Sequence, residues 1–323
     1  MPTLEEFAHS ETIYADDFAK AIAICGDLRK KAPSKPFHLI LRKSETRGNF
    51  LFPYENFFLE GEEGASLIGS LYAKMKDEQG NELSTWKTAT LKVTGSHNLF
   101  KNLIIINDSG EPEMKGQEVA LAIYGDDNLF ANCTLRSTQD TLFVGPLPDD
   151  LSTRYIGFIP ENERYHEGNT QNDFVSCHIS GSVDFIFGAG KASFYRSVIG
   201  SVDDGREAAY VSAPAHSLKD DFGFYFDHCC FVNEGAKPQS IYLARPWRDY
   251  GKAVFAYCSY ENHIKTEGFS EWNAEQRYRT ARFEEYPLQK GRVAWTKNKE
   301  NAPLPERYRV ESKRLETLFQ RLK

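Results

Sequence analysis

The sequence predicts an all-β protein whose chain winds into a parallel β-helix, a solenoid of short stacked strands. Six strand-like segments share one residue pattern, while the distances between them vary widely. A solenoid explains both observations, because insertions lengthen its loops and leave the stacked strands unchanged. Long helical periodicity is missing from the region of the repeats, which argues against a doubly wound α/β fold.

Each repeat begins with phenylalanine and follows the pattern Phe-x-x-small/apolar-x-apolar. The segments are FKNLII from Phe100, FANCTL from Phe130, FVSCHI from Phe174, FYRSVI from Phe194, FDHCCF from Phe226 and FAYCSY from Phe255. Their phenylalanines are 30, 44, 20, 32 and 29 positions apart. Four of the repeats carry cysteine at the same position: Cys133, Cys177, Cys229 and Cys258. We therefore expect these thiols to be unpaired small apolar members of an inward ladder, not halves of disulfides.

Helices are predicted at the two ends of the chain. The apolar positions with helical spacing are Phe18, Ile22 and Leu28 within residues 15–31, and Leu315, Leu318, Phe319 and Leu322 near the C-terminus. We expect the first helix to cap the open end of the solenoid and the second to lie along its side. An uncovered last coil would expose strand edges and core. Residues 1–323 are therefore expected to form one domain.

Composition excludes several classes of protein. Hydrophobic residues make up 41% and charged residues 26% of the chain, as in globular proteins with a sizeable core. The net charge of −7 provides no basic field for nucleic acid, and no apolar stretch is long enough to span a membrane. No signal peptide is visible at the N-terminus. We therefore expect a cytoplasmic protein, and a monomer because a capped solenoid rarely needs partners. The alternative is a secreted protein whose signal is absent from this sequence.

One carboxylate is set inside a strongly apolar segment, SGSVDFIFGAG. Asp184 lies there between Val183 and Phe185, in a stretch that is typical of a buried strand. A buried carboxylate loses its water and needs donors around it. Three interpretations compete: a hydrogen-bonded structural residue, a metal ligand and a reactive group. The cysteines and histidines show no metal-ligand spacing.

The repeat gives Asp184 a partner. Asp140 follows Cys133 by seven residues, and Asp184 follows Cys177 by the same number. Residues 145–169 are rich in Pro, Gly, Asn and charge, which predicts an inserted loop. Without that loop the two aspartates lie on adjacent coils, whose strands are separated by about 4.8 Å.

Two carboxylates at that distance cannot both ionise easily, so one pKa should be low and the other raised. The first group can then act as a nucleophile and the second as a general acid. A structural stack bridged by amides or water is the alternative. Asp204 also follows Ser197 by seven residues, so the offset alone does not distinguish the two.

Other polar and aromatic residues fit a reactive site. Gln139 precedes Asp140, and Gln117 begins QEVALAIYGDD one coil earlier, so two amides can donate to an oxyanion. In YLARPWRDYG, Arg245 can hold a carboxylate in its ionised form and Trp247 can form a platform for a sugar ring. Taken singly, each residue has a structural alternative. A glutamine is often a surface amide, an arginine a solvated ion-pair partner and a tryptophan a core residue.

Four segments resemble pectinesterases and occur in the order of that family. They are GQEVAL from Gly116, STQDTLFVG from Ser137, ISGSVDFIFG from Ile179 and YLARPWRDYG from Tyr242. The resemblance implies a right-handed parallel β-helix that hydrolyses galacturonate methyl esters in pectin or oligogalacturonides and releases methanol. It implies no metal and no organic cofactor. The chain departs from the family pattern at Ala189, Ala244 and Ser137-Thr138, which predicts an altered fit to substrate and removes no reacting group.

The resemblance also assigns roles to single residues. Asp184 matches the nucleophile, and Asp140 the acid that protonates methanol and then the base that activates water. Gln117 and Gln139 match the amides that stabilise the tetrahedral intermediate, and Arg245 the residue that orients Asp184. Trp247, Val183 and Phe187 match positions that contact substrate.

Two other kinds of protein remain as alternatives. One is a polygalacturonate lyase or glycoside hydrolase on the same solenoid, and the other is a non-catalytic carbohydrate-binding solenoid. The complete set of Gln, Asp, Arg and Trp favours the esterase. The insertion at residues 145–169 is expected to shape the cleft and to favour short substrates.

Overall fold

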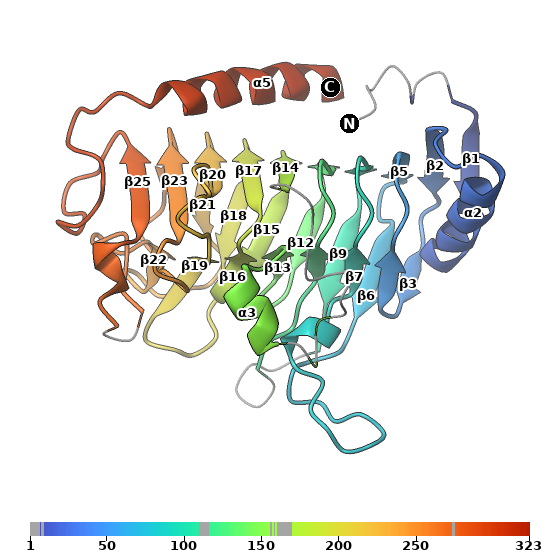
Figure 1. Ribbon diagram of the computed structural model, residues 1–323, viewed down its shortest axis with the longest axis horizontal. Helices are drawn as coiled ribbons and strands as arrows, with labels where there is room; N and C mark the ends of the chain where they lie inside the picture. Colours follow the sequence, from blue (N-terminus) through green and yellow to red (C-terminus); the bar gives the residue numbers. More distant parts are fainter. Residues whose placement is uncertain are drawn as a thin grey trace.

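The computed structural model describes residues 7, 10–109, 116–155, 157, 159, 170–272 and 275–323. In this part of the chain the strands form three parallel sheets of ten, seven and eight strands. Successive coils contribute one strand to each sheet in turn, which makes the elongated parallel β-helix seen in Figure 1. The predicted fold class is confirmed.

The three sheets are named here by their content. The ten-stranded phenylalanine sheet contains β1 (Thr12–Ala15), β2 (Phe37–Leu41), β5 (Phe57–Gly61), β8 (Leu99–Lys101), β11 (Leu129–Ala131), β14 (Gln171–Val175), β17 (Lys191–Tyr195), β20 (Phe224–Asp227), β23 (Lys252–Ala256) and β25 (Arg282–Tyr286). The seven-stranded cleft sheet contains β4 (Phe50–Phe52), β7 (Leu91–Val93), β10 (Leu121–Ile123), β13 (Leu142–Val144), β16 (Val183–Gly188), β19 (Ala209–Pro214) and β22 (Ile241–Ala244). The eight-stranded third sheet contains β3 (Glu45–Arg47), β6 (Ser66–Gly69), β9 (Ile104–Asn107), β12 (Thr134–Arg136), β15 (His178–Gly181), β18 (Val198–Ser201), β21 (Cys230–Asn233) and β24 (Ser259–Tyr260).

The six repeat phenylalanines form one continuous stack inside the solenoid. Each is the register partner of the next: Phe100, Phe130, Phe174, Phe194, Phe226 and Phe255. Neighbouring ring centroids are 4.6 to 5.2 Å apart. Parallel strands in register place like residues above one another, so a repeated Phe becomes a column of buried rings.

The cysteines form a second ladder beside the rings. The thiol of Cys133 donates to the carbonyl of Phe100 at 3.5 Å, and that of Cys177 to the carbonyl of Phe130 at 3.3 Å. Ser197 makes the equivalent bond in a coil without cysteine. All six cysteines are free, so the expectation of unpaired thiols is confirmed. Burial raises the pKa of Cys177 well above its usual value, which keeps the thiol protonated.

The N-terminal helix covers one end of the solenoid. Helix α2 (Phe18–Lys31) begins at Asp17, whose side chain accepts a hydrogen bond from the amide of Lys20 at 2.8 Å. Phe18 is buried in the interior core and meets Phe50 edge-on, with 5.3 Å between ring centroids. The helix begins later than predicted because Ala15 ends strand β1.

The C-terminal helix runs along the outer face of the phenylalanine sheet, as predicted (Figure 1). Helix α5 (Glu306–Leu322) buries Tyr308, Leu315 and Leu318 against it. Arg314 fastens the helix through two bonds to Asp173, at 2.7 and 2.8 Å. No helix among the described residues is long and apolar enough to cross a membrane.

The insertion at residues 145–169 leaves the coil intact around it. Strand β13 before it pairs directly with β16 after it, with Leu142 opposite Ile186. Part of the insertion forms helix α3 (Asp149–Arg154), and short 3-10 helices occur at η1 (Thr85–Lys87) and η3 (Arg277–Arg279). Residues 156, 158 and 160–169 lie outside the described part, so the prediction of a loop there is not tested.

We expect the phenylalanine stack to carry much of the stability. Phe174 lies between two rings, at 5.2 and 4.9 Å, so Phe174→Ala leaves a cavity that the stacked strands cannot close. The free energy of unfolding should fall by about 3–5 kcal/mol in urea denaturation. Leu218→Ala is the control, because Leu218 is 64% exposed. Equal losses in the two variants would contradict this view of the stack.

Candidate active site

Two aspartates lie on adjacent coils, where the neighbouring strands β13 and β16 of the cleft sheet begin. Asp140 and Asp184 both have left-handed backbone conformations, with φ of 66° and 50°. Aspartate is one of the few non-glycine residues that enter this region readily. The amide of Asp140 donates to the carbonyl of Val183 at 3.1 Å, so the equal offset from the cysteine ladder does stack the two positions. Both residues are buried.

Arg245 holds one of the two carboxylates. Its Nε donates to Oδ1 of Asp184 at 2.8 Å and its Nη2 to Oδ2 at 2.6 Å. The guanidinium carbon lies 3.8 Å from the ring centroid of Tyr210 and 4.2 Å from that of Trp272. Burial alone would lower the pKa of Arg245, but the charge and hydrogen bonds of Asp184 raise it. The cation is therefore fixed beside the Asp184 carboxyl group by two charge-assisted hydrogen bonds.

Asp140 has the opposite electrostatic environment. Burial and then the negative charge of Asp184 raise its pKa well above the usual value. Glu118 acts in the same direction, and the charges of Arg245 and Arg206 oppose it without compensating for it. Asp140 is therefore the carboxyl that keeps its proton. The two carboxyl groups differ as a nucleophile and a general acid must.

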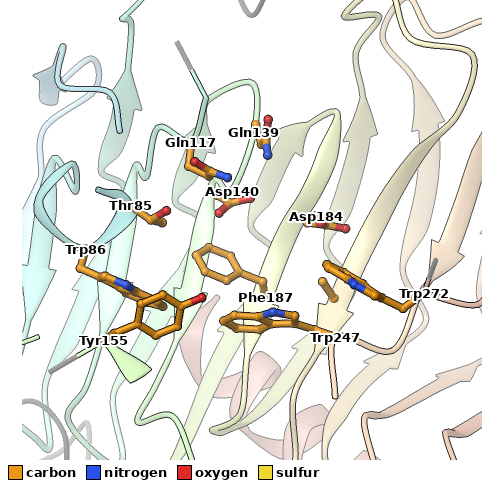
Figure 2. A pocket seen from close by; sticks show the side chains of 11 residues that line it. Thr85, Trp86, Gln117, Gln139, Asp140, Tyr155, Asp184, Phe187, Trp247 and Trp272 are labelled. Atoms are coloured by element: carbon orange, nitrogen blue, oxygen red, sulfur yellow. The ribbon is translucent and has the colours of Figure 1, made fainter. Parts of the chain in front are cut away.

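Two glutamine amides border the aspartates. Figure 2 shows the amide nitrogens of Gln117 and Gln139 turned toward the space beside Asp140. Oε1 of Gln139 accepts a hydrogen bond from Nη2 of Arg206 at 3.1 Å. The carbonyl of Gln117 accepts one from the amide of Ala73 at 2.9 Å, which ties the loop before β10 in place. Neutral donors in this position suit a developing oxyanion.

Aromatic rings form the walls of the cleft (Figure 2). The cavity has a volume of about 170 Å³. Its lining consists of Thr85, Trp86, Gln117, Gln139, Asp140, Tyr155, Asp184, Phe187, Ala213, Trp247 and Trp272. Trp86 from η1 meets Tyr155 at 4.9 Å, and Phe187 meets Trp247 at 6.0 Å between ring centroids. Such rings can stack on the apolar faces of sugars and exclude water from the reacting carboxylates.

The arrangement contains the groups for acyl transfer to a carboxylate. Asp184, bonded to Arg245, faces the cavity, Asp140 with its raised pKa lies one coil away, and two amides can donate to an oxyanion. In the described part of the chain, no three His, Cys, Asp or Glu side chains converge as a metal site would need.

The chain matches one known protein family across this site. The model of the family Pectinesterase matches residues 56–147 and 163–307, which include both aspartates, both glutamines and Arg245. The chain belongs to the pectinesterase family.

Relatives of known sequence agree with this membership. Pectinesterase QRT1 of Arabidopsis thaliana is 31% identical over 229 residues, which cover 68% of this chain and 52% of that protein. Pectinesterase 2 of Olea europaea is 32% identical over 209 residues, covering 64% and 49%. The chain therefore spans about half the length of the pectinesterases that it matches.

Solved structures show the same fold. The pectin methylesterase from Aspergillus niger superposes with a TM-score of 0.72 at 18% identity, over 95% of both chains. A pectin methylesterase in complex with a hexasaccharide has a TM-score of 0.68 at 20% identity, over 94% of this chain and 95% of that one. The fold is the right-handed parallel β-helix of pectinesterases.

The structure brings nearly all the residues singled out in the sequence to one place. Asp140, Asp184, Gln117, Gln139, Phe187 and Trp247 line the cleft, and Arg245 lies behind it against Asp184. Their roles in a reaction stay predictions. Ala244 is part of the interior core, and Ala189 is partly buried among the rings behind the cleft.

Val183 is the exception, because it lies in the interior core and does not line the cleft. Strand β16 pairs with β19 as Val183 opposite Tyr210 and Ile186 opposite Ser212, so β16 carries one extra residue between the pairs. Simple alternation would place Val183 and Phe187 on the same face. The bulge reverses this, so Val183 joins the interior core while Phe187 faces the cleft.

Other residues of the cleft were not found in the sequence. They are Thr85, Trp86, Tyr155, Ala213 and Trp272. Most come from loops and short helices outside the repeat, where coil register predicts nothing. The scarcity of tryptophan was one available signal. The chain has only four tryptophans, and three of them line the cleft.

The raised pKa of Asp140 has a consequence for stability. In the unfolded chain the carboxyl titrates near pH 3.9, below its value in the folded protein. Its contribution to stability is complete below that pH and is lost as pH rises through the folded pKa. Asp140→Asn removes this loss and keeps a residue that tolerates positive φ. The variant should be more stable than wild type near neutral pH, with an advantage that fades toward about pH 4.

Urea denaturation at several pH values measures this difference. Asp27→Asn is the control, because the Asp27 side chain is 69% exposed on α2. A stability difference between Asp140→Asn and wild type that does not change with pH would contradict the raised pKa.

Proposed function

We propose that the chain is a carboxylic ester hydrolase that removes methyl esters from galacturonate units of pectin or oligogalacturonides. The observation that carries the proposal is the unequal treatment of the two stacked aspartates. Arg245 forms two bonds to Asp184, whereas burial and repulsion raise the pKa of Asp140. Membership of the pectinesterase family and the hexasaccharide bound by a structural neighbour support the substrate class.

The first half of the reaction forms an acyl-enzyme. A carboxylate oxygen of Asp184 attacks the ester carbonyl carbon, and the carbonyl oxygen becomes an oxyanion that accepts hydrogen bonds from Gln117 and Gln139. When the tetrahedral intermediate collapses, the bond to the methoxy oxygen breaks. Asp140 gives its proton to that oxygen, so the leaving group departs as methanol. The galacturonyl group is then joined to Asp184 as a mixed anhydride.

The second half returns the enzyme to its starting state. Asp140, now a carboxylate, takes a proton from water as the water oxygen adds to the galacturonyl carbonyl carbon. The bond to Asp184 breaks, which restores its carboxylate beside Arg245 and releases galacturonic acid, which then loses its proton to water. Arg245 stabilises the carboxylate both as nucleophile and as leaving group.

Methanol release tests the proposal directly. Wild type should release methanol from methylated pectin or from short methylated oligogalacturonides, and Asp184→Asn should lower kcat by about 10³-fold or more. Undiminished activity in Asp184→Asn would contradict the nucleophile assignment. If wild type instead produced unsaturated products or new reducing ends without methanol, it would be a lyase or a glycoside hydrolase.

We also propose that the insertion at residues 145–169 favours short substrates. Tyr155, which follows α3, lies against Trp86 and lines the cleft with it (Figure 2). Tyr155→Ala should therefore raise kcat/KM for polymeric pectin relative to a methylated trimer. Tyr257→Ala, at a half-exposed tyrosine remote from the cleft lining, is the control. An unchanged polymer-to-trimer ratio in Tyr155→Ala would count against this role.

A further inference from the structure

The amide of Gln139 has a charged partner that the reaction does not use. Nη2 of Arg206 donates to Oε1 of Gln139 at 3.1 Å. A guanidinium has only donors, so the amide must present its oxygen to Arg206. Its nitrogen then lies on the other side. In Figure 2 the oxygen of Gln139 points away from the cleft and the nitrogen lies toward Asp140.

Arg206 is itself held in place by a buried carboxylate. Its Nη1 lies 3.2 Å from Oδ2 of Asp204, whose side chain is only 2% exposed. The backbone amide of Arg206 donates to Oδ1 of the same group at 3.2 Å. Oγ of Ser182, two residues before Asp184, contacts Oδ2 of Asp204 at 2.7 Å. A chain of polar contacts therefore runs from Ser182, just before strand β16, to the amide of Gln139.

This inference rests on the esterase function proposed above. We propose that Arg206 is a positioning residue that fixes the orientation of the Gln139 amide, so that its nitrogen donates to the oxyanion. Without Arg206 the amide is free to rotate, and in half of its orientations it would present an oxygen lone pair to a negative charge. A cation bonded to the amide oxygen also polarises the N–H bonds and strengthens them as donors.

The charge of Arg206 has a second, separable effect. The charged groups that act on Asp140 are Asp184, Glu118, Arg245 and Arg206. Asp184 and Glu118 raise the pKa of Asp140, whereas the two arginines lower it. Removing the charge of Arg206 therefore raises this pKa further. A role confined to local folding would not move the pH dependence of the reaction in this way.

Two variants test what the donor and the charge of Arg206 contribute together. Arg206→Met removes both, and Arg206→Lys keeps a positive charge and a donor. In Arg206→Met, kcat for methanol release should fall by about 10- to 100-fold with little change in KM, because the loss is confined to the transition state. The alkaline limb of its pH profile should move to higher pH. In Arg206→Lys the limb should stay near its wild-type position, and part of kcat should return.

Arg47→Gln is the matched control, because Arg47 is an exposed arginine that pairs with Asp108 at 2.9 Å elsewhere on the third sheet. Its kcat and pH profile should equal those of wild type. A wild-type kcat and pH limb in Arg206→Met would overturn the proposal. A raised KM with unchanged kcat would also overturn it, because Arg206 would then bind substrate directly.

Failure of the proposed function gives a different result, namely a wild-type protein that releases no methanol. A crystal structure of Arg206→Met then still tests the geometry without activity. A rotated or disordered Gln139 side chain supports the positioning role. A Gln139 side chain in its wild-type place overturns it.

Discussion

The molecule depends on one constraint, the in-register stacking of its parallel coils. Hydrogen bonds between parallel strands place a residue of one coil directly above its partner in the next. Equal offsets along the chain therefore become neighbours in space. Phe130 and Phe174 stack although 44 residues separate them, because β11 and β14 pair in parallel with the two phenylalanines as register partners. The same register that stacks the rings in the core also stacks Asp140 on Asp184 at the cleft.

Chemistry at this site follows from giving two buried carboxyl groups only one bidentate arginine. Arg245 donates two hydrogen bonds to Asp184 and is fixed between Tyr210 and Trp272. Asp140 has burial and repulsion without that compensation, so it favours its proton. Asp140 and Asp184 look alike in the sequence, but their different surroundings in the folded protein suit them to different roles. Holding the two carboxyl groups this close is electrostatically unfavourable, which is common at catalytic sites.

Around this pair, the solenoid lets loops change while the scaffold stays the same. Trp86, Tyr155 and Trp272 all come from segments outside the strands, and all three line the cleft. Insertions there do not disturb the coil, as the direct pairing of β13 with β16 shows. The chain keeps the pectinesterase fold at about 20% identity to solved structures over nearly its whole length. Fit to substrate can therefore vary without any change to the stacked aspartates.

The sequence by itself determined the coil, the phenylalanine stack, the unpaired cysteine ladder and the stacking of Asp140 on Asp184. A solenoid converts spacing into contact, so a repeat with a constant offset carries three-dimensional information. Only the tertiary structure decided which side Val183 faces, since a bulge interrupts the alternation of β16. It alone also placed Tyr155, Trp272 and Arg206, because loops of variable length carry no register and their contacts form only when the coils are stacked.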